Sequence, residues 1–196
     1  AFIKGGLIKI VTTEEKSSAI KVTRNYTQSG GTVQATVNGN GSKIVNCDGT
    51  VSFTGGKLTG FSNGTVTSDE TSAGGIKSEG NISITNGTIA IECNGKGSKG
   101  INCNGDVTID GGLVTLVATG DNYTEIADDK KSRAITAELV TVNNGKVIAS
   151  AHDNAVAATA DIVVNGGIMN AYSETADALS FEATQTGGWL LTKDAE

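Results

Sequence analysis

The amino-acid sequence predicts an all-β fold, a single-stranded right-handed parallel β-helix, and three observations carry this prediction. A Gly-Gly or Asn-Gly pair recurs along the chain, β-branched residues alternate with polar ones around each pair, and Pro is absent whereas Gly accounts for 27 of the 196 residues. Self-similarity at a regular period is typical of repeat architectures. Because the repeats lack the leucine spacing of leucine-rich solenoids, they indicate stacked β-coils.

The recurring pair sets the length of one coil. Its second residue, which we call the marker glycine, stands at Gly31, Gly56, Gly87, Gly112, Gly145, Gly167 and Gly188, with a partial copy at Gly6. The regular intervals between marker glycines are 21 to 25 residues, and two intervals are longer, at 31 and 33 residues. A coil buries its apolar side only against its neighbours. We therefore predict about seven coils in a single domain, residues 1–196.

Each coil is expected to form three short strands. Apolar residues stand about 11, five and three positions before the marker glycine and two and four positions after it. In the coil of Gly112 these residues are Ile101, Val107, Ile109, Val114 and Leu116. Alternation with a period of two predicts strands that bury one face. The glycine pair between two strands predicts a tight turn with positive φ.

The cysteines and two aromatic residues are assigned to the scaffold. Cys47 and Cys103 occupy equivalent positions two coils apart, about 10 Å, which exceeds the Cα separation of about 7 Å that a disulfide tolerates. Cys93 lies elsewhere on its coil, and without a Cys-x-x-Cys pair or a His partner zinc is not expected. Tyr26 falls on an inward position, and Trp189 is expected to cap the core at the terminal coil.

Two inserted loops account for the long intervals. They span residues 61–75 and 121–134 and follow the same strand in coils that are two apart. We expect them to emerge from the same side of the rod, about 10 Å from each other. Recognition sites are commonly built on loops that a rigid scaffold positions. The alternative is that both loops are solvated insertions without a ligand.

The candidate ligand-binding residues lie in these loops and on one outward row. An aromatic face can stack on a sugar ring, and carboxylates or amides can hydrogen-bond its hydroxyls. The outward row contains Lys21, Asn46, Lys77, Asn102 and Thr136. The alternative for this row is a surface ladder that is stabilised by its own stacking. The predicted ligand-binding residues are Phe61, Tyr123, Asp69, Asp121, Lys77 and Asn102.

No metal site and no cofactor are predicted, although calcium is left open. Calcium takes six to eight oxygen ligands, and single carboxylates on successive coils supply only part of such a shell. The acids that gather near a second glycine turn are Asp48, Glu79, Asp106 and Asp161. Asp153 and Asp177 form a further candidate pair.

No catalytic residue is predicted. His152 is the only histidine and is expected on a surface turn. Arg133, near Asp128 and Asp129 in the second inserted loop, keeps a polysaccharide lyase open as an alternative. The formal net charge of −6 and the presence of only two arginines argue against nucleic acid as a partner. No stretch approaches the roughly 20 apolar residues of a membrane span, so membrane insertion is not expected.

Two segments resemble a known family. Residues 73–91, AGGIKSEGNISITNGTIAI, and residues 98–120, SKGINCNGDVTIDGGLVTLVATG, follow the rhythm G-I-K-x-x-G-x-[VI]-x-I-x-G-G-x-[VIL]. This rhythm is similar to that of the bacterial carbohydrate-binding β-helix domain family, whose fold is related to pectate lyases. The resemblance covers roughly residues 17–170. Where the family carries acidic residues before the inward Ile, this chain has Ser, Lys or Arg, as in GSKGI (97–101).

The resemblance implies a non-catalytic, exported or surface-associated protein, and some family members look like cellulose or pectin binders with calcium. We therefore predict a polysaccharide-binding module of an exported bacterial protein, secreted or held at the cell surface. A structural or adhesive surface β-helix without a sugar ligand is the first alternative, and a polysaccharide lyase is the second. The identity of the glycan and the oligomeric state stay open.

Overall fold

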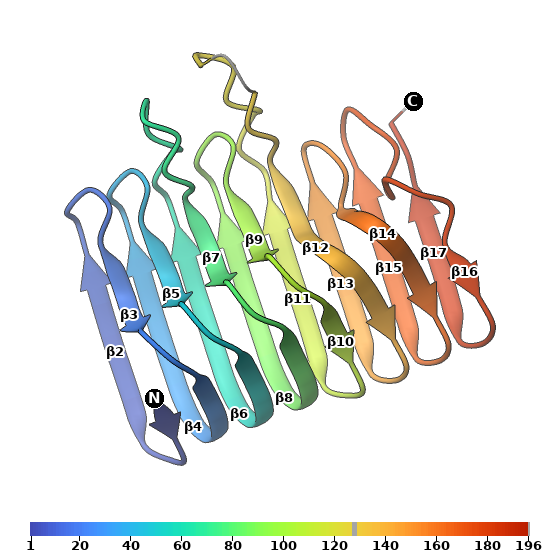
Figure 1. Ribbon diagram of the computed structural model, residues 1–196, viewed down its shortest axis with the longest axis horizontal. Coiled ribbons are helices and arrows are strands. Elements are labelled where there is room, and N and C mark those ends of the chain that lie inside the picture. The colour runs from blue at the N-terminus through green and yellow to red at the C-terminus, as the bar shows by residue number, and fades with distance from the viewer. Residues whose placement is uncertain (127–128, 196) are drawn as a thin grey trace.

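The computed structural model describes residues 1–126 and 129–195, and Figure 1 shows the path of the chain. The described residues contain 17 β-strands and no helix, and the strands pair in parallel within one 17-stranded sheet. The strands are β1 (Phe2–Ile3), β2 (Leu7–Thr12), β3 (Ser18–Val22), β4 (Tyr26–Val37), β5 (Lys43–Cys47), β6 (Val51–Ser62), β7 (Gly74–Ser78), β8 (Ile82–Cys93), β9 (Lys99–Cys103), β10 (Val107–Ile109), β11 (Leu113–Ala118), β12 (Arg133–Val142), β13 (Lys146–Ala151), β14 (Val156–Val164), β15 (Ile168–Ser173), β16 (Thr184–Gln185) and β17 (Trp189–Lys193).

Each strand pairs with a strand one repeat away, and the pairs build three stacks. The pre-glycine stack contains β1, the first halves of β4, β6 and β8, then β10, the second halves of β12 and β14, and β16. The post-glycine stack contains β2, the second halves of β4, β6 and β8, then β11, β13, β15 and β17. The third stack contains β3, β5, β7, β9 and the first halves of β12 and β14. This all-β, mainly parallel arrangement agrees with a β-helix or solenoid (Figure 1).

The apolar positions that the repeat marks form the core. The residues of the coil of Gly112 that were expected to point inward are all buried, and one connected cluster of buried side chains extends from Ile3 to Ala178. Burial of such a side chain stabilises the fold by about 1.5–3 kcal/mol. The row of the third stack that contributes to this core is in register across Ile20, Val45, Ile76, Ile101, Ile135 and Val156.

Tyr26 and the cysteines lie in this core, as expected. Tyr26 is fully buried, its ring tilts against Phe53 with the centroids 5.6 Å apart, and its hydroxyl donates to Gln28 Oε1 at 2.8 Å. The free, buried thiols are those of Cys47, Cys93 and Cys103.

Trp189 corrects one expectation. It is 77% exposed in β17 and pairs with Ile168, an outward residue of β15. Side chains alternate along a strand, so the neighbouring Leu190 takes the inward position and packs against the core instead. The prediction that Trp189 caps the core is therefore wrong.

A column of glycines lies between the post-glycine and third stacks. At Gly95 a Cβ atom would lie 1.9 Å from the carbonyl oxygen of Gly64, and at Gly64 it would lie 2.0 Å from that of Gly39. Backbone atoms held in hydrogen-bonded coils cannot move aside as a flexible side chain does. The coils therefore stack at this turn because these positions carry no side chain.

Gly95→Ala is expected to destabilise the protein by about 1–3 kcal/mol, the typical cost of forcing atoms into filled space. Gly6→Ala isolates backbone strain, because Gly6 has a φ of 81° and open space at its Cβ position. Gly5→Ala is the control, because its Cβ would meet nothing within 4 Å and its φ lies outside the left-handed region. Urea unfolding should show the largest loss for Gly95→Ala, and equal losses for all three would contradict the stacking argument.

Candidate functional site

Both inserted loops leave the sheet at the same end of the post-glycine stack, where they project beyond the other turns in Figure 1. The first connects β6 with β7, and the second connects β11 with β12. Each loop leaves from a stacked turn that contains a member of the glycine column, Gly64 or Gly120. The stacked turns therefore determine where both loops start.

The first inserted loop is organised around Asp69. Lys16 Nζ from the first turn lies 2.7 Å from Asp69 Oδ2, and the hydroxyls of Thr67 and Thr71 donate to Asp69 Oδ1. The Lys16 ammonium, followed by the Thr67 hydroxyl, holds the pKa of Asp69 well below its usual range. Both carboxylate oxygens are thus used within the protein, and Asp69 supports the shape of the loop.

A groove of about 440 Å³ lies between the two inserted loops. Its floor is a row of turn residues from four successive coils, Glu15, Asn40, Thr65 and Lys96. Backbone hydrogen bonds that end on the carbonyls of Asn40, Thr65 and Lys96 stack these turns. The remaining lining residues come from the two loops, namely Val66, Thr67, Ser68, Tyr123 and Glu125.

The structure separates Phe61 from Tyr123. Phe61 is 49% exposed and points outward from β6, between two shallow hollows of the post-glycine stack. Tyr123 is only 7% exposed, lies against Gly97 and lines the groove between the loops. Its hydroxyl has no hydrogen-bond partner among the described residues. Tyr123 therefore offers no open ring face, contrary to the stacking role expected from the sequence.

The outward row expected on the third stack is present. Its members Lys21, Asn46, Lys77, Asn102 and Thr136 are in register on β3, β5, β7, β9 and β12. Lys77 Nζ lies 3.2 Å from Glu79 Oε1 and also donates to Asn104 Oδ1. The remaining predicted residue, Asp121, is exposed at the start of the second inserted loop, and its backbone carbonyl accepts from Ser132 Oγ at 3.0 Å.

A second row of the third stack carries cations. Lys43, Gly74, Lys99 and Arg133 follow one another in register, and we call these four positions the cationic row. Lys43 is 8% exposed, and its ammonium donates to the carbonyl oxygens of Gly41 at 3.1 Å and Ser72 at 2.6 Å. Lys43 thereby ties the first inserted loop to the stack.

Lys99 is the uncompensated member of the cationic row. Burial, followed by the charges of Arg133, Lys130 and Lys77, lowers the pKa of Lys99 to about 8. No carboxylate or carbonyl of the described residues pairs with its ammonium. A partly buried cation without a counter-ion is a candidate for binding an anionic group.

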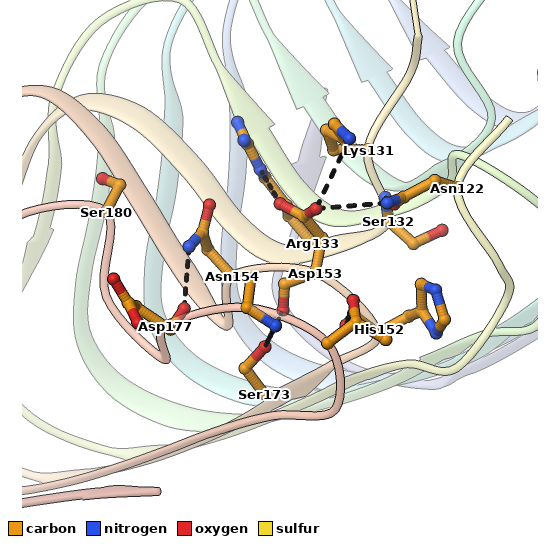
Figure 2. Close-up of polar contacts among 12 residues, drawn as sticks. Asn122, Lys131, Ser132, Arg133, His152, Asp153, Asn154, Ser173, Asp177 and Ser180 are labelled. Carbon is orange, nitrogen blue, oxygen red and sulfur yellow. Dashed lines mark hydrogen bonds and ion pairs between the residues drawn. The ribbon is translucent and has the colours of Figure 1, made fainter. Parts of the chain in front are cut away.

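Asp153 organises the end of the second inserted loop, as Figure 2 shows. Its carboxylate accepts from Arg133 Nε and Asn122 Nδ2, each at 3.2 Å, and lies 3.8 Å from Lys131 Nζ. Burial alone would raise the pKa of Asp153, but hydrogen bonds from the Asn154 backbone, Asn122 and Arg133 hold it below its usual value. Asp153 contacts Arg133 through Nε only. The terminal guanidinium nitrogens of Arg133 have no partner among the described residues.

Arg133 was considered for a lyase because it is near Asp128 and Asp129 in the second inserted loop. Asp153 is its partner, whereas Asp128 lies outside the described residues and Asp129 is exposed. His152 lies on a turn, as expected, with Nδ1 3.3 Å from Glu174 Oε2.

The acids considered for calcium do not share one row. Asp48 and Glu79 lie on successive coils, whereas Asp106 and Asp161 belong to other rows. Within residues 1–126 and 129–195, no three His, Cys, Asp or Glu side chains are grouped as metal ligands. The same residues include no helix that is long and apolar enough to cross a membrane.

Sequence reasoning did not single out Lys43 or Lys99, and it considered Asp153 only as one of a candidate calcium pair with Asp177. A signal existed for the two lysines, because they hold the same place in GSKIV (41–45) and GSKGI (97–101). The pairing of Asp153 with Arg133 carries no such signal, since the two residues lie 20 positions apart on different coils.

Asp153→Asn is expected to lower the free energy of unfolding by about 1.5–3 kcal/mol at pH 7, the typical contribution of hydrogen bonds to a charged group. The pKa of Asp153 is lower in the folded than in the unfolded state, so its stabilisation is fully present above about pH 4 and is lost as pH falls through the folded pKa. Urea unfolding between pH 2.5 and pH 7, tested at roughly half-unit steps, measures this. Asp48→Asn, at an exposed position, is the control. A loss that is constant over this range would contradict the assignment.

One comparison with known proteins identifies the family. A family model described as carbohydrate-binding domain-containing protein matches two overlapping stretches, residues 1–122 and 75–178. These stretches contain the groove, the cationic row and Asp153. Neither a search of curated proteins nor a search of solved structures gives a significant match. Because the model matches well over half of its length, the chain belongs to the carbohydrate-binding domain-containing family.

Proposed function

We propose that the chain is a non-catalytic polysaccharide-binding module of an exported bacterial protein, secreted or at the cell surface, and that its ligand carries carboxylate groups. Family membership supports sugar binding. The observation that carries the choice of an acidic glycan is the cationic row, above all Lys99 beside Arg133. We further propose a single domain, residues 1–196, built as a right-handed parallel β-helix of about seven coils.

Lys99 and Arg133 suit one carboxylate. They stand in register on β9 and β12, and parallel strands lie about 4.8 Å apart. Asp153 fixes the guanidinium through Nε, which leaves a planar pair of N–H donors of the kind that binds carboxylates bidentately. The charge of Lys99 is disfavoured by burial and by neighbouring cations. A carboxylate bound beside Lys99 would offset both effects, and this strengthens the binding of the carboxylate.

The adjacent outward row extends this site along the rod. Lys77 and Asn102 present a charged donor and an amide from successive strands, and both are partly exposed. The spacing of about 4.8 Å between coils is comparable to the length of one sugar residue. Consecutive units of an extended polyuronate would therefore meet consecutive coils.

Lys99→Met should weaken binding to a polyuronate about tenfold to a hundredfold, the equivalent of losing one hydrogen bond to a charged group. Binding by the wild-type protein should also weaken between pH 7 and pH 9, because the lowered pKa of about 8 removes the proton of Lys99 in this range. The variant should show a smaller pH dependence. Isothermal titration calorimetry with a polyuronate of defined length measures both effects.

Lys57→Met is the matched control, because it removes the same charge from an exposed position of the post-glycine stack. Binding should weaken with salt and survive EDTA, since the side chains themselves supply the cations. Loss of binding with EDTA would indicate calcium instead. A chain that binds no glycan but self-associates in light scattering would favour the structural or adhesive alternative.

One observation favours a polysaccharide lyase as a second candidate. An amine with a pKa near 8 beside a guanidinium can act as a general base next to a neutralised carboxylate. Such a base would remove the proton beside the carboxyl group of a uronate, and the glycosidic oxygen would leave to give an unsaturated sugar. We expect no rise in ultraviolet absorbance when the protein is incubated with polyuronate. A rise in absorbance that Lys99→Met abolishes would show that the protein is a lyase and would contradict the non-catalytic binding module.

A further inference from the structure

We propose that the groove between the inserted loops is a second binding site, specific for an uncharged sugar unit. The inference rests on the proposed carbohydrate binding, but it concerns a different surface from the cationic row. The groove lies at the turn that precedes the third stack and has residues of both inserted loops in its walls. Its volume of about 440 Å³ suits a small sugar unit rather than a macromolecular partner.

The floor offers hydrogen-bonding groups at a regular spacing. Glu15, Asn40, Thr65 and Lys96 come from equivalent turns, which stack about 4.8 Å apart. Asn40 Oδ1 already accepts from the Thr65 backbone at 3.0 Å, and Thr65 Oγ1 accepts from the Lys96 backbone at 3.3 Å. The Asn40 amide nitrogen, the Thr65 hydroxyl proton and the Lys96 ammonium are therefore left as donors, and the Glu15 carboxylate is the acceptor of this row. A sugar hydroxyl both donates and accepts, and this mixed set is complementary to it.

Tyr123 supplies the observation that points to a ligand. More than nine-tenths of this residue is buried, its backbone is fixed by hydrogen bonds in both directions with Lys130, and it lines the groove. Its hydroxyl has no partner within the described part of the chain. The hydroxyl oxygen itself is not among the fully buried polar atoms that lack a partner, so it is open to solvent. A ligand hydroxyl that enters the groove can replace that solvent as its hydrogen-bond partner.

The charge of the lining selects an uncharged unit. Glu15 and Glu125 contribute two carboxylates against the single ammonium of Lys96. Glu15 is neutralised only weakly, since its carboxylate lies 3.7 Å from an exposed Lys16. A uronate placed here would meet like charge, which disfavours its binding. The groove and the cationic row therefore differ in specificity.

The walls of the groove are held in place by contacts outside the groove. Glu70 of the first inserted loop pairs with Lys130 of the second, with Oε2 3.0 Å from Nζ. Asp69 ties the first loop to Lys16 at 2.7 Å. Loops that are ordered before the ligand arrives lose less conformational entropy on binding.

The two sites together imply a ligand of mixed composition. An acidic chain along the cationic row and a neutral unit in the groove would engage one molecule at two points, and linkage of two weak contacts raises the overall affinity. A polyuronate that carries neutral side units matches this description.

The test uses the full chain and a panel of neutral mono- to tetrasaccharides built on glucose, galactose and xylose, with binding followed by NMR chemical-shift titration. Tyr123→Phe, which keeps the buried ring and removes the hydroxyl, should weaken binding of the best neutral sugar about fivefold, as expected for one hydrogen bond. Tyr172→Phe, at a half-exposed tyrosine outside the groove, should leave it unchanged. Lys99→Met should also leave it unchanged, and saturating polyuronate should not displace the neutral sugar.

The outcomes separate this inference from the proposed function. If polyuronate binds through Lys99 and no neutral sugar binds, the groove assignment is overturned and the proposed function stands. If a neutral sugar binds but Tyr123→Phe has no effect, or polyuronate displaces the sugar, the groove assignment is likewise overturned. If neither class binds, both proposals fail.

Discussion

Backbone hydrogen bonds between neighbouring coils determine the geometry of this molecule, because they hold most strand residues opposite their equivalents one repeat away. The parallel register is continuous from β2 to β17 on the post-glycine stack. Neighbouring coils lie about 4.8 Å apart, so each side chain must fit between the equivalent side chains of the two coils beside it. The glycine column at Gly39, Gly64 and Gly95 is the extreme case, since even a Cβ atom would overlap the next carbonyl.

A row of like residues stabilises the stack when its side chains can hydrogen-bond one another, and destabilises it when they repel. An amide can both donate and accept, so Asn94 donates to Asn63 at 2.9 Å and Asn63 donates to Asn38 at 2.8 Å. Lysine only donates, and a row of lysines repels itself. The cationic row is relieved by Gly74, by carbonyl partners of Lys43 and by Asp153, but Lys99 receives no such partner from the described residues. The unpaired charge of Lys99 lowers the stability of the free protein, and an anionic ligand can therefore pair with it.

The sequence was a good guide wherever a position repeats and a poor one wherever it does not. Inward rows, the outward row of Lys77 and Asn102, and both loop positions follow from the period, since register carries each assignment from coil to coil. The burial of Tyr123 and the pairing of Arg133 with Asp153 depend on how non-repeating loop segments fold back on the scaffold. Trp189 was misassigned by a single position, because one step along a strand exchanges the buried and exposed faces.

The glycine column also explains why two chemically different surfaces adjoin. The inserted loops leave from the stacked turns that contain Gly64 and Gly120. They rise over the turn row of Glu15, Asn40 and Lys96 and return to the sheet at the cationic row. A loop that left the scaffold one strand earlier would cover the post-glycine stack instead. The acidic lining of the groove and the cations beside it thus follow from the point at which the repeat allows an insertion. In a chain with a formal net charge of −6, this places a partly buried positive charge without a counter-ion on the third stack, where the register orders the cations at the spacing of the coils.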